Sequence, residues 1–586
     1  MKNYIVQAWI VILSTLLLGS CTKIDLGQFT PDNPVISFSE QQLEVPNTMD
    51  TVFVEISSNL PYRLKTDKDW VKFVKPNGIG SEKVAIIITR NREQAIRTAQ
   101  VEAYITGEAS ASLTITQQAD DPLPDYTQHF YVKEAASADN TGLSWEQATT
   151  LDQALSSAND GDFIHLASGN YSPTLKLTGG TLPSDITFEI SQNIHLIGGY
   201  PSQASTGAIS NPAANPTTLT GADKATHVVS IVAPIKDKQQ VYLEGLIITK
   251  GKAGGSGSVT VQGNVLSRQH GGGMIIAGAK VELNQCRIQH NVSTNHAPGV
   301  YLTASAEVTM KEVSIKNNST TIAASNGGGI WNDGSTLTMY DSEIVDNRIG
   351  GVGAGLYSLH TVRVSKNMLY NVTIANNVCG IFGNNAVGGG IYAREKSIIY
   401  LVNSTVHGNK AGGTNYGGGI ALFGATEVTL INATVSANEG GTNATQAGGS
   451  GIHNSSAANN VLRIYNSLIV GNKGGTGDQL GGSTFATFES KSSLIKDLLY
   501  NYEGQSSITA VDVNQLFSPY ANYGGYAETL PLQGSHIAST AGMSSLQLQL
   551  LGANHPSVTA SYLLIDQNNK SRTGKRFMGA AFVGAE

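Results

Sequence analysis

The sequence contains little charge. Only 14% of its 586 residues are charged, and 37 basic and 44 acidic side chains leave a net charge of −7. Globular domains usually carry about 25% charged residues, and nucleic-acid-binding proteins gather basic residues on one face. The composition therefore excludes a nucleic-acid partner. With 65 glycines, it is instead typical of an all-β repeat protein rich in turns.

Motifs for catalysis and metal binding are also missing. The predicted β-helix contains no adjacent pair of aspartates, no acidic cluster with the ligand density that Ca²⁺ needs, and no Gly-Asp-Asp pattern of pectin hydrolases. The glycine triplets at 271–273 and 327–329 are coil turns, because neither a Lys-Ser/Thr pair nor a helix follows them. His165 and His195 are isolated strand histidines that we expect to be structural. The sequence predicts no metal and no cofactor, and favours binding over catalysis.

The first residues are typical of a secretory signal peptide. Lys2 precedes an apolar run, residues 4–18, that is too short to span a membrane. Leu-Gly-Ser-Cys at its end resembles a bacterial lipobox, which implies removal of residues 1–20 and lipidation of Cys21. The alternative is an ordinary signal peptide that happens to contain a cysteine.

The lipobox resemblance has a consequence for localisation. Thr22 stands where an Asp would mark retention in the inner membrane. An outer-membrane lipoprotein is therefore implied, with the lipid anchor on Cys21 and residues 21–34 as its tether. Several acyl chains on one cysteine anchor a protein firmly.

Residues 35–119 are predicted to form a small immunoglobulin-like β-sandwich, followed by a proline-containing linker at 120–128. Short alternating strands lie at 42–45, 51–56, 83–89, 101–105 and 112–116. The segment resembles a BACON domain in Ser58-Asn59, Asp69-Trp70-Val71, Pro76-x-Gly78-x-Gly80, Asn91, Arg97 and Thr116-Gln117-Gln118. The resemblance implies a carbohydrate-binding module or a spacer. Trp70 is then either a core residue or a platform for a sugar.

Residues 129–586 are predicted to form a right-handed parallel β-helix. The apolar positions within 146–159 share one helical face and predict a capping helix over the open end of the solenoid. The entry segment from His129 to Tyr171 resembles that of secreted β-helix proteins with polymorphic-outer-membrane-type repeats, and Tyr523–Ser535, Asp566–Asn569 and Gly579-Ala580 resemble the end of such proteins. The resemblance implies fold and secretion and says little about activity.

A seven-residue motif sets the register of the repeat. It starts at residues 244, 285, 312, 341, 371, 403, 432 and 466, so that every step after the first spans 27 to 34 residues. With one strand before the motif and one after it, each step fits a three-strand coil. The fourth residue is Ile or Val and should face the core, while the seventh is Asn from Asn291 onward. Asn tolerates left-handed turns and can form a hydrogen-bonded ladder. Asp or Asn at the first position from Asp341 onward suggests a second ladder.

The strand after the motif predicts an aromatic row. Its aliphatic residue should face the core, so the next residue faces outward in four consecutive coils: Tyr301, Trp331, Tyr357 and Tyr392. Sugar rings stack on aromatic faces, so the row is a candidate glycan-binding site. The alternative is a stacked ladder that stabilises the sheet beneath neighbouring loops.

Residues directly after the ladder Asn form a column along the solenoid, the charge column, in which all but Val378 are charged: Arg348, Val378, Lys410, Glu439 and Lys473. Polysaccharide lyases on this fold use a Lys or Arg base and neutralise the sugar acid with carboxylates or Ca²⁺. Lys410, Arg348 and Asp346 are therefore candidate catalytic residues, and we expect Asp346 and His407 to be neighbours in the stack. The alternative is a set of solvated surface charges, which the scarcity of charge favours.

Together these features predict a cell-surface outer-membrane lipoprotein whose β-helix binds glycan or host surface polymers. We expect it to be monomeric. One alternative is a polysaccharide lyase or glycosidase acting on an extended polysaccharide. The other is a structural surface protein with a protein partner.

Overall fold

The computed structural model describes residues 33–583 apart from 47–49, 69, 89–90, 92–94, 120–126, 237–238, 384–385, 414–415, 441–448, 457–458, 475–478, 510 and 556. The signal peptide, Cys21 and most of the tether lie outside the described residues. The chain divides into two compact units, 1–120 and 121–586. Among the described residues, no helix is both long and apolar enough to cross a membrane.

The first unit is a small β-sandwich of two sheets with orders β1-β3-β7-β5 and β2-β9-β8-β4-β6. Its strands are β1 Ile36–Phe38, β2 Gln42–Val45, β3 Asp50–Ser58, β4 Pro61–Thr66, β5 Val71–Phe73, β6 Asn77–Ile79, β7 Glu82–Ile88, β8 Arg97–Ile105 and β9 Ala109–Gln117. Alternating apolar residues such as Ile86 and Ile115 are fully buried between the sheets. Trp70 is buried with them, at 8% exposure, which places it in the core.

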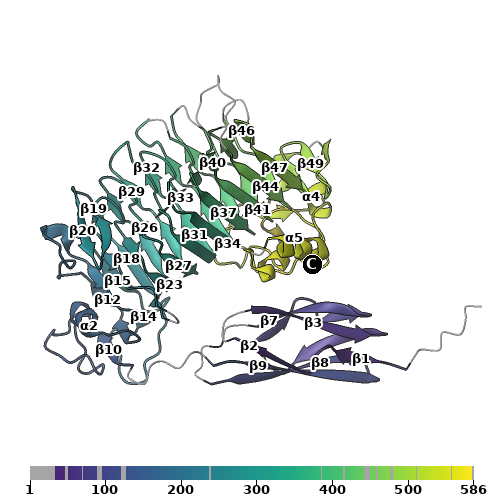
Figure 1. The fold of residues 1–586 in the computed structure, drawn as a ribbon, viewed down its shortest axis with the longest axis horizontal. Coiled ribbons are helices and arrows are strands. Elements are labelled where there is room, and N and C mark those ends of the chain that lie inside the picture. Colours follow the sequence, from purple (N-terminus) through teal and green to yellow (C-terminus); the bar gives the residue numbers. More distant parts are fainter. Residues whose placement is uncertain are drawn as a thin grey trace, which may run out of the picture. The chain divides into compact units, whose positions relative to one another are not determined.

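The second unit is a solenoid of parallel strands, stacked in Figure 1 from blue to green. One coil contains β27 Glu307–Lys311, β28 Ser314–Lys316, the short β29 Ser319–Thr320 and β30 Ile330–Asn332. The predicted three-strand coil is thus confirmed, with a two-residue strand added after the motif. The strands after each glycine turn form one ten-stranded sheet: β13 Phe188–Ile190, β16 Val229–Ile231, β22 Met274–Ala277, β26 Val300–Thr303, β30, β33 Leu356–Ser358, β36 Ile391–Arg394, β40 Ile420–Phe423, β43 Ile452–Asn454 and β46 Leu480–Gly482.

The Asn ladder is present. From Asn291 to Asn472, each side-chain amide donates to the side-chain oxygen of the next Asn at 2.8 to 3.0 Å. One detail of the prediction is wrong: the left-handed residues are the first and sixth of the motif, such as Asn371 (φ 54°) and Asn376 (φ 56°), and not the seventh. The seventh Asn is selected for its buried side-chain hydrogen bonds, and from Ile288 onward the Ile or Val at the fourth position is fully buried, as predicted. The predicted register of the first copy is wrong by one residue, because Ile248, and not Ile247, is buried and pairs with Ile288.

The ends of the solenoid differ from the prediction. The capping helix α2 spans only Leu151–Ser157, because Thr150 caps it by accepting a hydrogen bond from the Gln153 amide. Parallel stacking stops at β48 (Ser493–Ile495), after which β49 (Leu498–Tyr500) and β50 (Ser506–Ile508) pair antiparallel.

The rest of the chain, the C-terminal segment from residue 511 to 583, does not continue the coils. It contains α3 Val513–Leu516, β51 Leu532–Gln533, α4 Ile537–Thr540, α5 Ser545–Asn554 and β52 Phe582–Val583. It lies beside the last coils in Figure 1 and caps the second ladder, since Asn466 donates to Phe577 O at 3.0 Å and to Asn432 at 2.7 Å. This segment therefore covers the outer face of the C-terminal coils.

Candidate functional site

The predicted aromatic row lies in register on the ten-stranded sheet. Tyr301 pairs with Trp331, Trp331 with Tyr357 and Tyr357 with Tyr392 in adjacent strands. Neighbouring ring centroids are 5.2 to 5.7 Å apart. The row is therefore a continuous aromatic ladder along the solenoid.

The aromatic ladder is covered. Tyr301, Trp331, Tyr357 and Tyr392 are only 7%, 9%, 1% and 7% exposed. His270 packs on Trp331 with ring centroids 4.8 Å apart, and at the other end the Arg394 guanidinium lies 5.9 Å from the Tyr392 ring. A sugar needs an open ring face, so the geometry favours the stabilising ladder over a binding platform. As glycan-binding residues the four remain a prediction.

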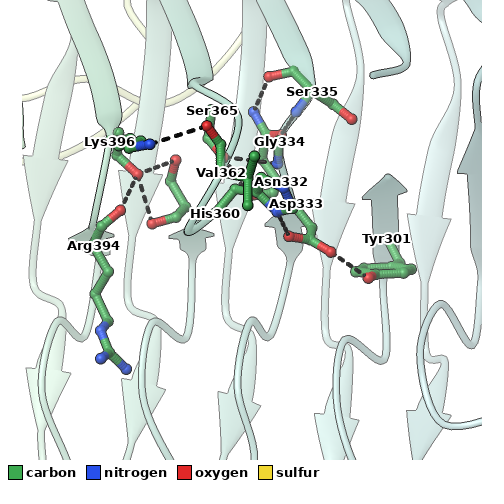
Figure 2. A network of polar contacts seen from close by, with 12 residues as sticks. Tyr301, Asn332, Asp333, Gly334, Ser335, His360, Val362, Ser365, Arg394 and Lys396 are labelled. Atoms are coloured by element: carbon green, nitrogen blue, oxygen red, sulfur yellow. Dashed lines mark hydrogen bonds and ion pairs between the residues drawn. The ribbon is translucent and has the colours of Figure 1, made fainter. Parts of the chain in front are cut away.

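A polar network holds one edge of the aromatic ladder (Figure 2). The Tyr301 hydroxyl donates to Asp333 Oδ2 at 2.7 Å, and His360 Nδ1 lies 2.8 Å from Asp333 Oδ1. Burial, and then the Asp333 charge, raise the pKa of Tyr301, so its hydroxyl stays protonated. Both carboxylate oxygens of Asp333 are engaged, which fits an anchor for the ladder.

The charge column is in register from Arg348 through Val378 and Lys410 to Glu439 and Lys473. Lys410 Nζ and Glu439 Oε1 are 2.8 Å apart, with both side chains about half exposed at 46% and 50%. The described residues contain no group of three His, Cys, Asp or Glu side chains placed to hold a metal ion. The catalytic roles of Lys410, Arg348 and Asp346 remain predictions.

The expected pairing of Asp346 with His407 is wrong. His407 pairs with Ala375, which pairs with Val345, so His407 occupies the fifth position of the motif and Asp346 the sixth. The His407 ring instead stacks on Tyr520 of the C-terminal segment at 4.6 Å. A base and a carboxylate are therefore not brought together at this point.

The first coils carry a second aromatic row that sequence reasoning missed. On β10 (His129–Val132), β11 (Phe163–Ala167), β14 (His195–Tyr200) and β17 (Val241–Glu244), the side chains of one outward position stack. These are His129, Phe163, His195 and Tyr242, with successive ring centroids 4.9, 4.2 and 5.5 Å apart. His195 is thus one ring of a stack, and not an isolated histidine as expected.

Beside this row lies a cavity of about 270 Å³, the aromatic cavity. Its lining residues are His129, Tyr131, Leu143, Ser144, Trp145, His165, Tyr200, Thr206, Gly207 and Ala208. The Trp145 ring is inclined by 56° to Tyr131 and by 54° to Tyr200, and His165 meets Tyr200 at 86°. Rings at such angles surround a volume, and all but the buried Trp145 are at least partly exposed.

A β-bulge puts Tyr200 in place. The register between β11 and β14 shifts after His165, so that Ala167 pairs with Tyr200. Gly199 supplies the required left-handed backbone (φ 86°). The Tyr200 hydroxyl consequently lies 2.9 Å from His165 Nδ1, while His165 Nε2 lies 2.9 Å from His129 Nδ1.

The polar groups of the aromatic cavity are uncharged at neutral pH. Burial, and then the neighbouring histidines, lower the pKa of His165 to about 4. Burial also lowers the pKa of His129 and raises the pKa of Tyr200 to about 12, with Glu244 adding to the latter. The lining therefore offers hydrogen bonds and ring faces without a formal charge.

Comparisons with known families agree with this architecture. Residues 252–413 match the family model described as "Right handed beta helix region", and residues 56–118 match the BACON model, described as "Putative binding domain, N-terminal". The second unit is a right-handed parallel β-helix. No curated protein matches the chain.

Two solved structures resemble parts of the chain. The crystal structure of pectate lyase Pel9A is 16% identical, with a TM-score of 0.42, over 72% of this chain and 92% of the lyase. A GH5 xyloglucanase of Bacteroides ovatus in complex with a XXXG heptasaccharide is 14% identical, with a TM-score of 0.14, over 28% of this chain and 45% of the enzyme. Values this low carry no argument about activity.

The aromatic cavity of the β-helix did leave a signal in the sequence. His129 and Tyr131, and likewise Phe163 and His165, are two residues apart, as outward side chains of one strand must be. Their coils precede the first copy of the seven-residue motif at residue 244, so the motif could not set their register.

Proposed function

We propose that the β-helix binds a saccharide in the aromatic cavity. The observation that carries this proposal is the set of inclined aromatic rings around an open volume of about 270 Å³. The C–H faces of a sugar pack on aromatic rings, while its hydroxyls bond to polar groups at their edges. Since ligand pockets usually measure about 300–1,000 Å³, this volume suits a sugar unit or a chain end more than a long segment of polymer.

The proposal extends to the place of binding. The lipobox-like sequence ending at Cys21 supports an outer-membrane lipoprotein, presented at the cell surface on its tether. The BACON match adds a second module of a family described as binding. Such a chain would hold glycan or host surface polymers close to the membrane. A lyase activity gains no comparable support, because the described residues of the column from Arg348 to Lys473 include no cluster of three His, Cys, Asp or Glu side chains that could hold a metal ion, and the Lys410 ammonium is paired with Glu439.

The test fills the aromatic cavity without removing any of its rings. Thr206 lines the cavity and is exposed, so Thr206→Trp should block the volume and leave the fold intact, with Thr206→Ala as the matched control. The full chain and both variants would be applied to a glycan array, and hits measured by calorimetry. We expect at least a tenfold loss of affinity in Thr206→Trp and little change in Thr206→Ala. Failure of the unmodified chain to bind any glycan, or unchanged binding by Thr206→Trp, would refute the proposal.

A further inference from the structure

We infer that the aromatic cavity selects an uncharged, hydroxyl-rich saccharide and recognises one of its hydroxyl groups through the hydrogen-bonded chain His129–His165–Tyr200. This inference rests on the proposed function and assigns it a ligand class. It follows from the two hydrogen-bonding contacts within the chain, from the lining of the cavity and from the charges around it.

The first step concerns the protons in the chain. A neutral imidazole has one N–H donor and one acceptor nitrogen, and a tyrosine hydroxyl can donate or accept. His165 uses both ring nitrogens, one towards His129 and one towards Tyr200, each at 2.9 Å. Two neutral arrangements satisfy both contacts. In one, His129 Nδ1–H donates to His165, which donates to Tyr200. In the other, Tyr200 O–H donates to His165, which donates to His129.

The second step concerns the two ends of the chain. In the first arrangement the Tyr200 hydroxyl hydrogen is free to donate outward, while His129 Nε2 accepts. In the second arrangement His129 Nε2–H donates outward, while the Tyr200 oxygen accepts. Both residues line the cavity, so the cavity always presents one donor and one acceptor, and the two exchange roles together.

The third step compares possible ligands. A sugar hydroxyl is itself both a donor and an acceptor, so it suits either arrangement at either end of the chain. A carboxylate only accepts and can use only the donor end. No Lys, Arg, Asp or Glu side chain lines the cavity, and burial lowers the pKa of His129 and His165, which keeps them neutral. A buried carboxylate would therefore lack a cationic partner, which is costly.

The fourth step concerns the surrounding charges. The Asp162 charge raises the pKa of His129, and the Glu244 charge raises the pKa of Tyr200. The Lys133 Nζ lies 5.8 Å from the Trp145 ring, but Lys133 does not line the cavity. His195, beside His165, also lowers the pKa of His165. Two carboxylates and one ammonium do not attract an anion. The surroundings therefore reinforce the preference for a neutral ligand.

The experiment compares matched sugars on the full chain. Calorimetry measures the affinities of galacto- and gluco-oligosaccharides and of the corresponding uronic-acid oligomers. The two members of each pair differ only in that COO⁻ replaces CH₂OH. We expect at least tenfold tighter binding of the neutral member of each pair. Equal or tighter binding of the uronate would overturn the inference while leaving the cavity a saccharide site. Absence of binding by both members, and by every other glycan, would instead refute the proposed function.

A second measurement tests the hydrogen-bonded chain itself. Tyr200→Phe keeps the ring and removes only the hydroxyl, so we expect three- to tenfold weaker binding of the neutral sugar, since a hydrogen bond contributes about 1 kcal/mol. The control is Tyr370→Phe, which removes a hydroxyl that donates to Ser557 O at 3.0 Å beneath the C-terminal segment. Equal affinities of Tyr200→Phe and the unmodified protein would show that these hydrogen bonds do not contribute to recognition of the ligand. Thermal melting of both variants monitors folding.

Discussion

The aromatic ladder and the aromatic cavity both lie on the outer surface of the β-helix, and they differ in what lies above them. The aromatic ladder from Tyr301 to Tyr392 is at most 9% exposed, because His270 and His296 pack against its first rings and Arg394 against its last. The aromatic cavity in the first coils has partly open rings around its volume. The outward direction of a side chain in a solenoid thus does not establish its exposure, which depends on the insertions that cover the sheet.

The largest expected effect is on stability in the aromatic ladder. Tyr357 is 1% exposed and is among the largest fully buried side chains, so Tyr357→Ala should lower the free energy of unfolding by about 3–5 kcal/mol. Urea unfolding followed by circular dichroism measures this change. Tyr131→Ala in the aromatic cavity should cost clearly less, because Tyr131 is already partly exposed. Similar losses in both variants would remove the contrast between the two clusters.

The pH dependence of stability should also reflect the covered state of the aromatic ladder. Burial lowers the pKa of His270 to about 3, whereas histidine in the unfolded chain titrates near about 6.5. Between these values the unfolded chain binds the additional proton, so stability falls as the pH decreases from about 6.5 and levels off near about 3. His270→Phe keeps an aromatic ring and should make the thermal midpoint less dependent on pH. Identical slopes in the two proteins would show that His270 is not held neutral.

A smaller effect is expected on binding. Tyr131→Ala removes one ring face from the aromatic cavity, and aromatic contacts of this kind contribute about 0.5–1.5 kcal/mol. Glycan affinity should therefore fall about two- to tenfold. Trp331→Ala in the aromatic ladder should destabilise the fold and leave the affinity of the folded protein unchanged. Loss of glycan binding in Trp331→Ala alone would instead show that the glycan-binding site is the aromatic ladder, as the sequence predicted.

The sequence is sufficient to predict the coils of the β-helix, but it does not predict which parts of their outer surface are covered. The motif from residue 285 onward repeats the core Ile or Val and the ladder Asn in every coil, because each coil makes the same contacts with the next. The spacing of the motif therefore predicts which residues pair in adjacent coils and which side chains of each strand face the core.

Covering segments do not repeat, so their positions could not be predicted. The hairpin near residue 260 is an insertion in one coil, and the C-terminal segment crosses several coils. The aromatic cavity depends on the bulge at Gly199 and on Trp145 from a non-repeating loop. These contacts exist only in three dimensions and leave no periodic pattern.

The smallest expected effects belong to the charge column. Lys410 and Glu439 form a half-exposed pair at 2.8 Å, and surface ion pairs contribute about 0–1 kcal/mol. Lys410→Ala and Arg348→Ala should therefore shift the free energy of unfolding by less than about 1 kcal/mol and leave glycan binding unchanged. Incubation of the unmodified chain with uronic-acid polymers should give no unsaturated product, as followed by ultraviolet absorbance. Product that disappears in Lys410→Ala would instead establish a lyase, and would show that this column, and not the aromatic cavity, is the functional surface of the β-helix.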